Sequence, residues 1–151
     1  MTAKRRQARR PTRLPRWQEW AVYISAILLI LTGIAWLAFD WWVRVEGDFG
    51  PEHHPAEHWL LIAHGASAYL FLLVVGAMIP VHFLMGWRSR RNLVSGIGVA
   101  SLCALLALSA LGLYYVGEEV LRGWTSFIHW TVGLIFLPVL AVHIVNGWNS
   151  R

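Results

Sequence analysis

The sequence predicts an all-α integral membrane protein built as a bundle of four transmembrane helices. Of its 151 residues, 57% are hydrophobic and only 14% are charged, and the mean hydropathy is +0.51. A soluble domain of this size would not tolerate that balance. The apolar residues also gather into four long runs that carry almost no charge, each long enough to cross a hydrocarbon core of roughly 30 Å.

Basic and acidic residues separate to opposite ends of these runs. Seven of the thirteen basic residues precede position 17, whereas seven of the eight acidic residues lie in the two alternate loops: Asp40, Glu46, Asp48, Glu52, Glu57, Glu118 and Glu119. Positive residues stay on the cytoplasmic side, so we expect a multi-pass protein of a bacterial inner membrane with cytoplasmic N- and C-termini. Orientation and contact with anionic membrane lipid account for the basic tail, and no nucleic-acid partner is expected.

Two domains are predicted: a disordered, basic cytoplasmic tail over 1–16 and a transmembrane domain over 17–151. The first apolar run, about 20–39, lacks a small-residue cleavage site and is read as a retained helix. Residues 40–57 are expected to form an acidic loop outside the cytoplasm. The second helix spans about 56–87, and Pro80 should kink it near its inner end.

The third run, 93–116, opens with small residues that favour close helix packing: Ser95, Gly96, Gly98, Ala100 and Ser101. A short turn leads to the fourth run, about 120–145. Tryptophans cluster at the predicted membrane boundaries, as in an aromatic belt. Cys103 is the single cysteine, which excludes a disulfide framework or a thiolate-based metal site.

Four histidines lie within two of the runs, His64 and His82 in the second, His129 and His143 in the fourth. They are separated by eighteen and fourteen residues, or roughly 27 Å and 21 Å of helix, so each pair shares one helix face. The second and fourth helices run in the same direction. His64 should therefore lie level with His129 near the outer surface, and His82 level with His143 near the inner one.

Ionisable side chains inside a membrane are costly and indicate function. Neutral imidazole is a common iron ligand, and two histidines at one depth can bind a haem iron from both faces. We expect His64 and His129 to ligate an outer haem iron and His82 and His143 an inner one. Arg122 is a candidate partner for haem propionates, and Gly65, Gly76 and Gly133 would leave room for the macrocycles.

The segments HPAEHWLLIAHGASAYLFLLVVGAMIPVHFLMGWR and LYYVGEEVLRGWTSFIHWTVGLIFLPVLAVHIVNGW resemble the four-helix di-haem cytochrome b proteins, which include the cytochrome b subunits of hydrogenase and formate dehydrogenase. By this resemblance the four histidines match axial-ligand positions. The hydrogenase type usually takes one ligand from the first helix, which has no histidine here. Two histidines on each of two helices is an arrangement more similar to the cytochrome b of quinol:cytochrome c complexes. In that family the two histidines on each ligand helix are about fourteen residues apart.

The resemblance implies electron transfer through two b haems, linked to quinone or quinol and to a redox protein partner. The chain would be a quinone-coupled oxidoreductase or its cytochrome b subunit. Two alternatives remain open: a transporter or channel component whose histidines relay protons or bind metal, and a pigment-binding protein.

Two further groups are weaker candidates. His54 and His58 lie one helical turn apart beside Glu57 and could bind zinc or copper, although solvated interfacial histidines explain them better. An outer quinol headgroup could bind beside Tyr114, Tyr115, Glu118 and Glu119.

Overall fold

The computed structural model describes residues 14–90 and 92–149, and it confirms the predicted all-α bundle of four membrane-spanning helices. The spans are α1 (Arg16–Trp42), a second span over Ala56–Ser89, α4 (Leu93–Tyr115) and α5 (Glu119–Asn149). The protein is therefore an integral, multi-pass membrane protein. Most of the predicted tail, residues 1–13, lies outside the described residues, and the helix already begins at Arg16.

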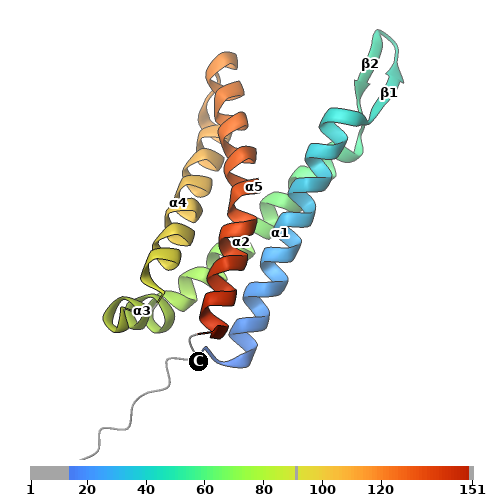
Figure 1. Ribbon diagram of the computed structural model, residues 1–151. Coiled ribbons are helices and arrows are strands. Elements are labelled where there is room, and N and C mark those ends of the chain that lie inside the picture. Colours follow the sequence, from blue (N-terminus) through green and yellow to red (C-terminus); the bar gives the residue numbers. More distant parts are fainter. Residues whose placement is uncertain (1–13, 91, 150–151) are drawn as a thin grey trace, which may run out of the picture.

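The bundle consists of two helical hairpins. The first hairpin joins α1 to the second span, and the other joins α4 to α5; close approach of backbones occurs mainly within each hairpin. Figure 1 shows that the start of α1 and the end of α5 lie at the same end of the molecule. The two hairpins meet through side chains of the second span and of α5, such as Phe71 and Phe136, and through Trp41 of α1 against Trp130 of α5.

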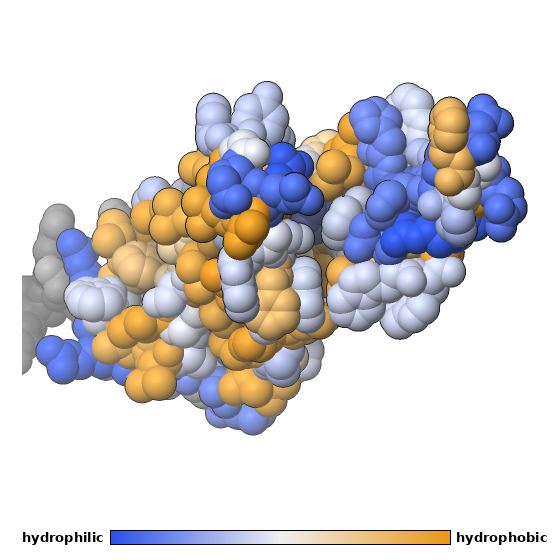
Figure 2. All heavy atoms as spheres, turned by 90° about the horizontal axis from the view of Figure 1, so that it is seen from above, coloured by the Kyte–Doolittle hydropathy of each residue, from blue (hydrophilic) through white to orange (hydrophobic). Residues whose placement is uncertain are grey.

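Apolar side chains face outward over most of the surface. In the described part of the chain, the buried hydrophobic residues are Ala26, Phe71 and Phe136 alone. Seen from above in Figure 2, hydrophilic side chains gather at one side of the end view, and hydrophobic side chains cover much of the remaining flank. This distribution suits lipid as the surrounding solvent, because hydrocarbon does not penalise an exposed leucine or isoleucine.

The segment predicted as a loop after the first helix contains a β-hairpin instead. Strands β1 (Arg44–Gly47) and β2 (Gly50–His53) pair in antiparallel register, with Arg44 opposite His53. Gly50 has φ +119, a value that side-chain-bearing residues rarely adopt. A strand with so few apolar residues carries no periodic signal, which is why the sequence predicts only a loop.

The second span changes helix type at Pro80. It consists of α2 (Ala56–Met78), a π-helical turn η1 (Ile79–Phe83) and α3 (Leu84–Ser89). Pro80 cannot donate a backbone hydrogen bond, and the wider turn accommodates its ring. Figure 1 shows α3 running in a different direction from α2, as the predicted kink requires. Pro138 lies inside α5, which continues as an α-helix through it.

Candidate functional site

The structure brings His64 and His129 together toward the end of the bundle that carries β1 and β2. This end is called the outer end from here on, and the end with the start of α1 and the end of α5 is called the inner end. Their ring centroids are 6.3 Å apart and the ring planes are perpendicular, with an interplanar angle of 90°. His64 comes from α2 and His129 from α5, so this contact joins the two helical hairpins. Within the described residues, no hydrogen bond links the two rings.

His82 and His143 form a second pair of almost the same geometry near the other end of the bundle. Their ring centroids lie 6.0 Å apart, again at 90°. His82 belongs to the π-helical turn η1, and His143 lies near the end of α5. The structure therefore places the four histidines in two facing pairs, one in each half of the bundle.

A serine on α4 fixes the ring of His129. The hydroxyl of Ser109 donates to the carbonyl oxygen of Leu106 at 3.1 Å, so its oxygen must accept from the Nδ1–H of His129 at 2.8 Å. With the proton on Nδ1, the lone pair of this imidazole is on Nε2. A metal-binding histidine is oriented in the same way, by a hydrogen bond from its other ring nitrogen.

Ser95 does the same for His143. Its hydroxyl donates to the carbonyl oxygen of Asn92 at 3.2 Å, and its oxygen accepts from the Nδ1–H of His143 at 3.0 Å. Fourteen residues separate the two serines, and fourteen separate the two histidines. Both serine–histidine contacts thus follow one antiparallel register between α4 and α5.

The ring of His64 is held by α1. Its Nδ1 lies 3.1 Å from the carbonyl oxygen of Leu29 and 3.3 Å from the hydroxyl of Thr32. A carbonyl only accepts, so this Nδ1 also carries the proton. A Cβ added at Gly33 would come within 2.9 Å of Cε1 of His64, closer than such contacts occur. Gly33 lets α1 lie directly against the imidazole.

The ring of His82 has no such support among the described residues. His82 belongs to the π-helical turn η1, two residues after Pro80, so the placement of its ring depends on the bend of its own span.

An aromatic pair separates the two histidine pairs. Phe71 and Phe136 are 6% and 3% exposed, and their ring centroids lie 6.1 Å apart. Phe136 is seven residues from both His129 and His143, and Phe71 is seven residues after His64. At about 1.5 Å per residue, the pair lies roughly 10 Å below the outer histidines. An apolar layer thus interrupts the column of polar side chains.

The spacing of both pairs fits a single metal ion bound by two imidazoles. An imidazole nitrogen lies about 1.1 Å from the ring centre and a metal–nitrogen bond is about 2.0 Å, so two rings on opposite sides of one ion have centres roughly 6.2 Å apart. The observed separations are 6.3 and 6.0 Å. Three of the four rings also have their Nδ1 engaged elsewhere, which leaves Nε2 for the ion.

Other predicted residues lie elsewhere or have a structural role. Arg122 is exposed on α5. Gly65 and Gly76 face open space, and Gly133 meets only Leu106, whereas the glycines that touch histidine rings are Gly33 and Gly96. Glu118 accepts hydrogen bonds from the backbone N–H groups of Val120 and Leu121 and so caps α5. Tyr114 and Tyr115 are exposed and contact each other.

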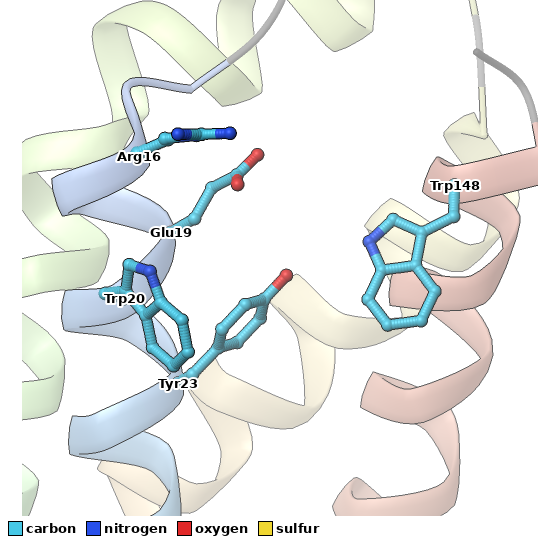
Figure 3. A pocket seen from close by; sticks show the side chains of 5 residues that line it. All are labelled: Arg16, Glu19, Trp20, Tyr23 and Trp148. Carbon is cyan, nitrogen blue, oxygen red and sulfur yellow. The ribbon is translucent and has the colours of Figure 1, made fainter.

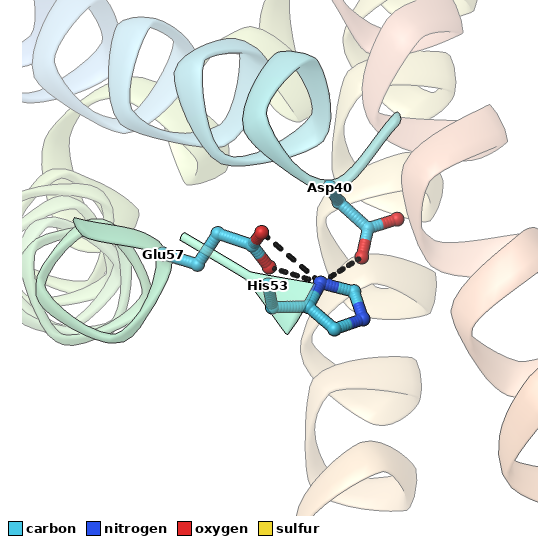
Figure 4. Close-up of side chains that lie close together, drawn as sticks. All are labelled: Asp40, His53 and Glu57. Atoms are coloured by element: carbon cyan, nitrogen blue, oxygen red, sulfur yellow. Dashed lines mark hydrogen bonds and ion pairs between the residues drawn. The ribbon is translucent and has the colours of Figure 1, made fainter. Parts of the chain in front are cut away.

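The outer end of the first hairpin holds a further cluster of Asp40, His53 and Glu57, drawn in Figure 4. The sequence pattern indicates His54 and His58 as the candidate metal ligands of this segment and indicates no role for His53. His54 accepts a hydrogen bond from the backbone N–H of Ala56, and the His58 ring contacts Trp59. The strand pairing that brings His53 to Arg44 has no signature in the sequence.

A pocket of about 520 Å³ lies at the opposite end of the bundle, beside the start of α1 and the end of α5. Figure 3 shows Trp148 facing the four lining residues from α1, which are Arg16, Glu19, Trp20 and Tyr23. Trp148 is five residues after His143 on α5, or roughly 7.5 Å along the helix. The pocket combines flat aromatic walls with charged and hydroxyl groups.

No protein family, curated protein or solved structure matches this chain in comparisons of its sequence and fold.

Proposed function

We propose that this protein transfers electrons across a membrane through two b-type haems, one held by His64 and His129 and the other by His82 and His143. The observation that carries the proposal is the repeated geometry of the two histidine pairs. Both have the ring separation of a two-imidazole metal site, and the rings with assigned tautomers have Nε2 unprotonated. When bound, haem iron supplies a centre that gains and loses one electron.

The chain orients the ligands and keeps the interior dry. The imidazoles cannot rotate freely because each Nδ1–H donates a hydrogen bond. The acceptors are the carbonyl oxygen of Leu29 and the hydroxyl oxygens of Ser109 and Ser95. These hydrogen bonds also make the ligands more basic, which stabilises the oxidised state of a bound iron. The Phe71–Phe136 pair fills the space between the two layers with apolar atoms.

The phenylalanine pair favours electron transfer over a histidine proton relay. A relay needs a continuous series of hydrogen-bonding side chains or water between its members. Here the buried aromatic contact lies between the two histidine layers. The outer layer is about two helical turns away from it, and the inner layer is at least two turns away on the other side. Electrons can cross an apolar gap of this kind, whereas protons require polar groups.

The charge distribution supports an inner-membrane location in a bacterium, with the start of α1 and the end of α5 in the cytoplasm. The pocket at that end is the site proposed for a quinone or quinol, whose flat ring would pack against Trp148 while Arg16 and Tyr23 donate hydrogen bonds to its oxygens. A redox protein partner would exchange electrons at the outer face. The chain would serve as a quinone-coupled oxidoreductase or its cytochrome b subunit.

The test is the haem content and absorption spectrum of the purified protein. We expect two haem b per chain by the pyridine haemochrome assay and an α-band in the reduced-minus-oxidised spectrum. Protein that is expressed with ample haem supply but contains none would overturn the proposal. A metal-dependent ion flux in vesicles containing the haem-free protein would then favour a transporter.

A further inference from the structure

The cluster at the outer end of the first hairpin gathers three metal-ligating groups from three elements. Asp40 comes from the last turn of α1, His53 from β2 and Glu57 from the first turn of α2. One ligand atom from each of the three lies within 4.8 Å of the other two. Figure 4 shows Glu57 and Asp40 pointing toward His53 from opposite sides.

The Nδ1 atom of His53 has more close neighbours than one nitrogen can satisfy. It lies 2.9 and 3.0 Å from the two carboxylate oxygens of Glu57, which only accept, and 2.7 Å from Nη1 of Arg44, which only donates. If Nδ1 carries a proton, two donors face each other at the arginine contact. If it carries none, two acceptors face each other at the carboxylate contact. Either protonation state leaves one short contact unfavourable.

Arg44 occupies the position of a cation in this cluster. Its Nη1 lies beside Nδ1 of His53 and 3.6 Å from Oε1 of Glu57, while Nη2 donates to the carbonyl oxygen of Asp40. The side chain of Glu57 is only 10% exposed, so its charge needs a positive partner. The side chain of Arg44 is 40% exposed and can withdraw into water when another cation takes its place.

We infer that Asp40, His53 and Glu57 form a binding site for a divalent transition-metal ion of the zinc type. One imidazole nitrogen and two carboxylates match the mixed nitrogen and oxygen ligands of such ions, whereas calcium and magnesium prefer oxygen alone. With the metal bound, Nδ1 of His53 is unprotonated and the conflict at this atom disappears. The side chain of His53 is 61% exposed, so water can complete the coordination.

This site is distinct from the two histidine pairs, and the inference does not rest on haem. Glu57 is seven residues before His64 on one face of α2, and Asp40 is seven residues after Gly33 on α1. At about 1.5 Å per residue, the site lies roughly 10 Å above the outer pair. The metal would therefore bind at the mouth of the outer half of the bundle.

The test is calorimetric titration of Zn²⁺ into the full chain, purified in detergent without a polyhistidine tag, and compared with His53→Ala and His58→Ala. We expect one zinc ion per chain. His53→Ala should weaken binding at least about tenfold. His58→Ala should leave it unchanged, because His58 is an exposed histidine near the cluster but outside it. Helical circular dichroism and size-exclusion chromatography confirm that each variant is folded.

Arg44→Ala sharpens the test. Removing the competing cation should tighten zinc binding by up to about fivefold, the range expected for one partly screened charge interaction. Equal zinc affinity in the original protein and in His53→Ala would overturn the inference. Weaker binding in Arg44→Ala would also overturn it, because the arginine would then support the site instead of competing for it.

Discussion

The outer and inner histidine pairs have nearly equal ring separations, 6.3 and 6.0 Å, but they are held in different ways. In the outer pair, α1 and α4 each provide an acceptor for the Nδ1–H of one ring, so both imidazoles are fixed. In the inner pair, only His143 has a hydrogen bond among the described residues, to Ser95. His82 depends on the shape of its own helix at Pro80. Hydrogen bonds from neighbouring helices thus position both rings of the outer pair, whereas the bend at Pro80 positions His82 in the inner pair.

Removal of a ligand is expected to have the largest effect. His129→Ala should lose the outer haem and keep the inner one, and His143→Ala should do the reverse, so that each variant retains about half of the haem. The pyridine haemochrome assay measures this loss. Added imidazole should restore the outer site of His129→Ala more readily than the inner site of His143→Ala, because His64 stays oriented by Leu29. Equal loss of both haems in either variant would contradict the separation into two layers.

The glycines that lie against the rings give the next largest effect. In Gly33→Ala the new Cβ would come within 2.9 Å of Cε1 of His64, a ring that its hydrogen bonds prevent from moving. Such overpacking costs about 1–3 kcal/mol, so haem affinity at the outer site should fall about tenfold. Haem titration of the haem-free protein measures it.

Gly96→Ala is the matched control in the inner half. There the Cβ would lie 3.5 Å from Cε1 of His143, an ordinary contact distance. We expect less than a twofold change in the affinity of the inner site. A large effect of Gly96→Ala combined with a small effect of Gly33→Ala would contradict the closer contact of Gly33 with its histidine ring.

Pro80→Ala should perturb the inner pair alone. Alanine restores the missing backbone donor and favours a regular α-helix, which would rotate His82 away from His143. We expect inner haem occupancy to fall several-fold while the outer haem remains, as resolved by redox titration followed spectroscopically. Pro138→Ala is the control, since α5 is already a regular helix there. Loss of the outer haem in Pro80→Ala would show that the bend also positions His64.

The serine substitutions should have the smallest effect. Ser109→Ala and Ser95→Ala each remove an acceptor from a histidine Nδ1–H, which makes the ligand less basic and raises the reduction potential of the iron it binds. A hydrogen bond worth about 1 kcal/mol corresponds to an upward shift of roughly 40 mV for one electron. Spectroscopic redox titration should show Ser109→Ala shifting the outer haem and Ser95→Ala the inner one. Unchanged reduction potentials in both variants would show that these hydrogen bonds do not tune the bound iron.

The fold was predictable because hydropathy and charge patterns extend over segments of twenty or more residues and do not depend on contacts between helices. Four apolar runs and alternate acidic loops define the spans to within a few residues, and Pro80 marks the bend. The hairpin at 44–53 was missed because its stability comes from cross-strand contacts such as that of Arg44 with His53, which leave no periodic pattern.

The histidine positions were predictable from helical spacing, but their surroundings were not. Ser95 and Gly96 were read only as packing residues, and Thr32, Gly33 and Ser109 had no assigned role. Each lies on a neighbouring helix, and the contact depends on a register that the sequence of one helix does not contain. A seven-residue repeat through His129, Phe136 and His143 could have revealed the aromatic layer.

The common register of the two serine–histidine contacts has a consequence for length changes. Because Ser109 with His129 and Ser95 with His143 follow one alignment of α4 against α5, inserting or deleting a residue in the short connection between these helices would misalign both contacts at once. An insertion at the tip of the β-hairpin would be absorbed locally, because Phe49 there is fully exposed and the strands end in a turn. The two connections at the outer end should therefore differ sharply in their tolerance of insertions and deletions.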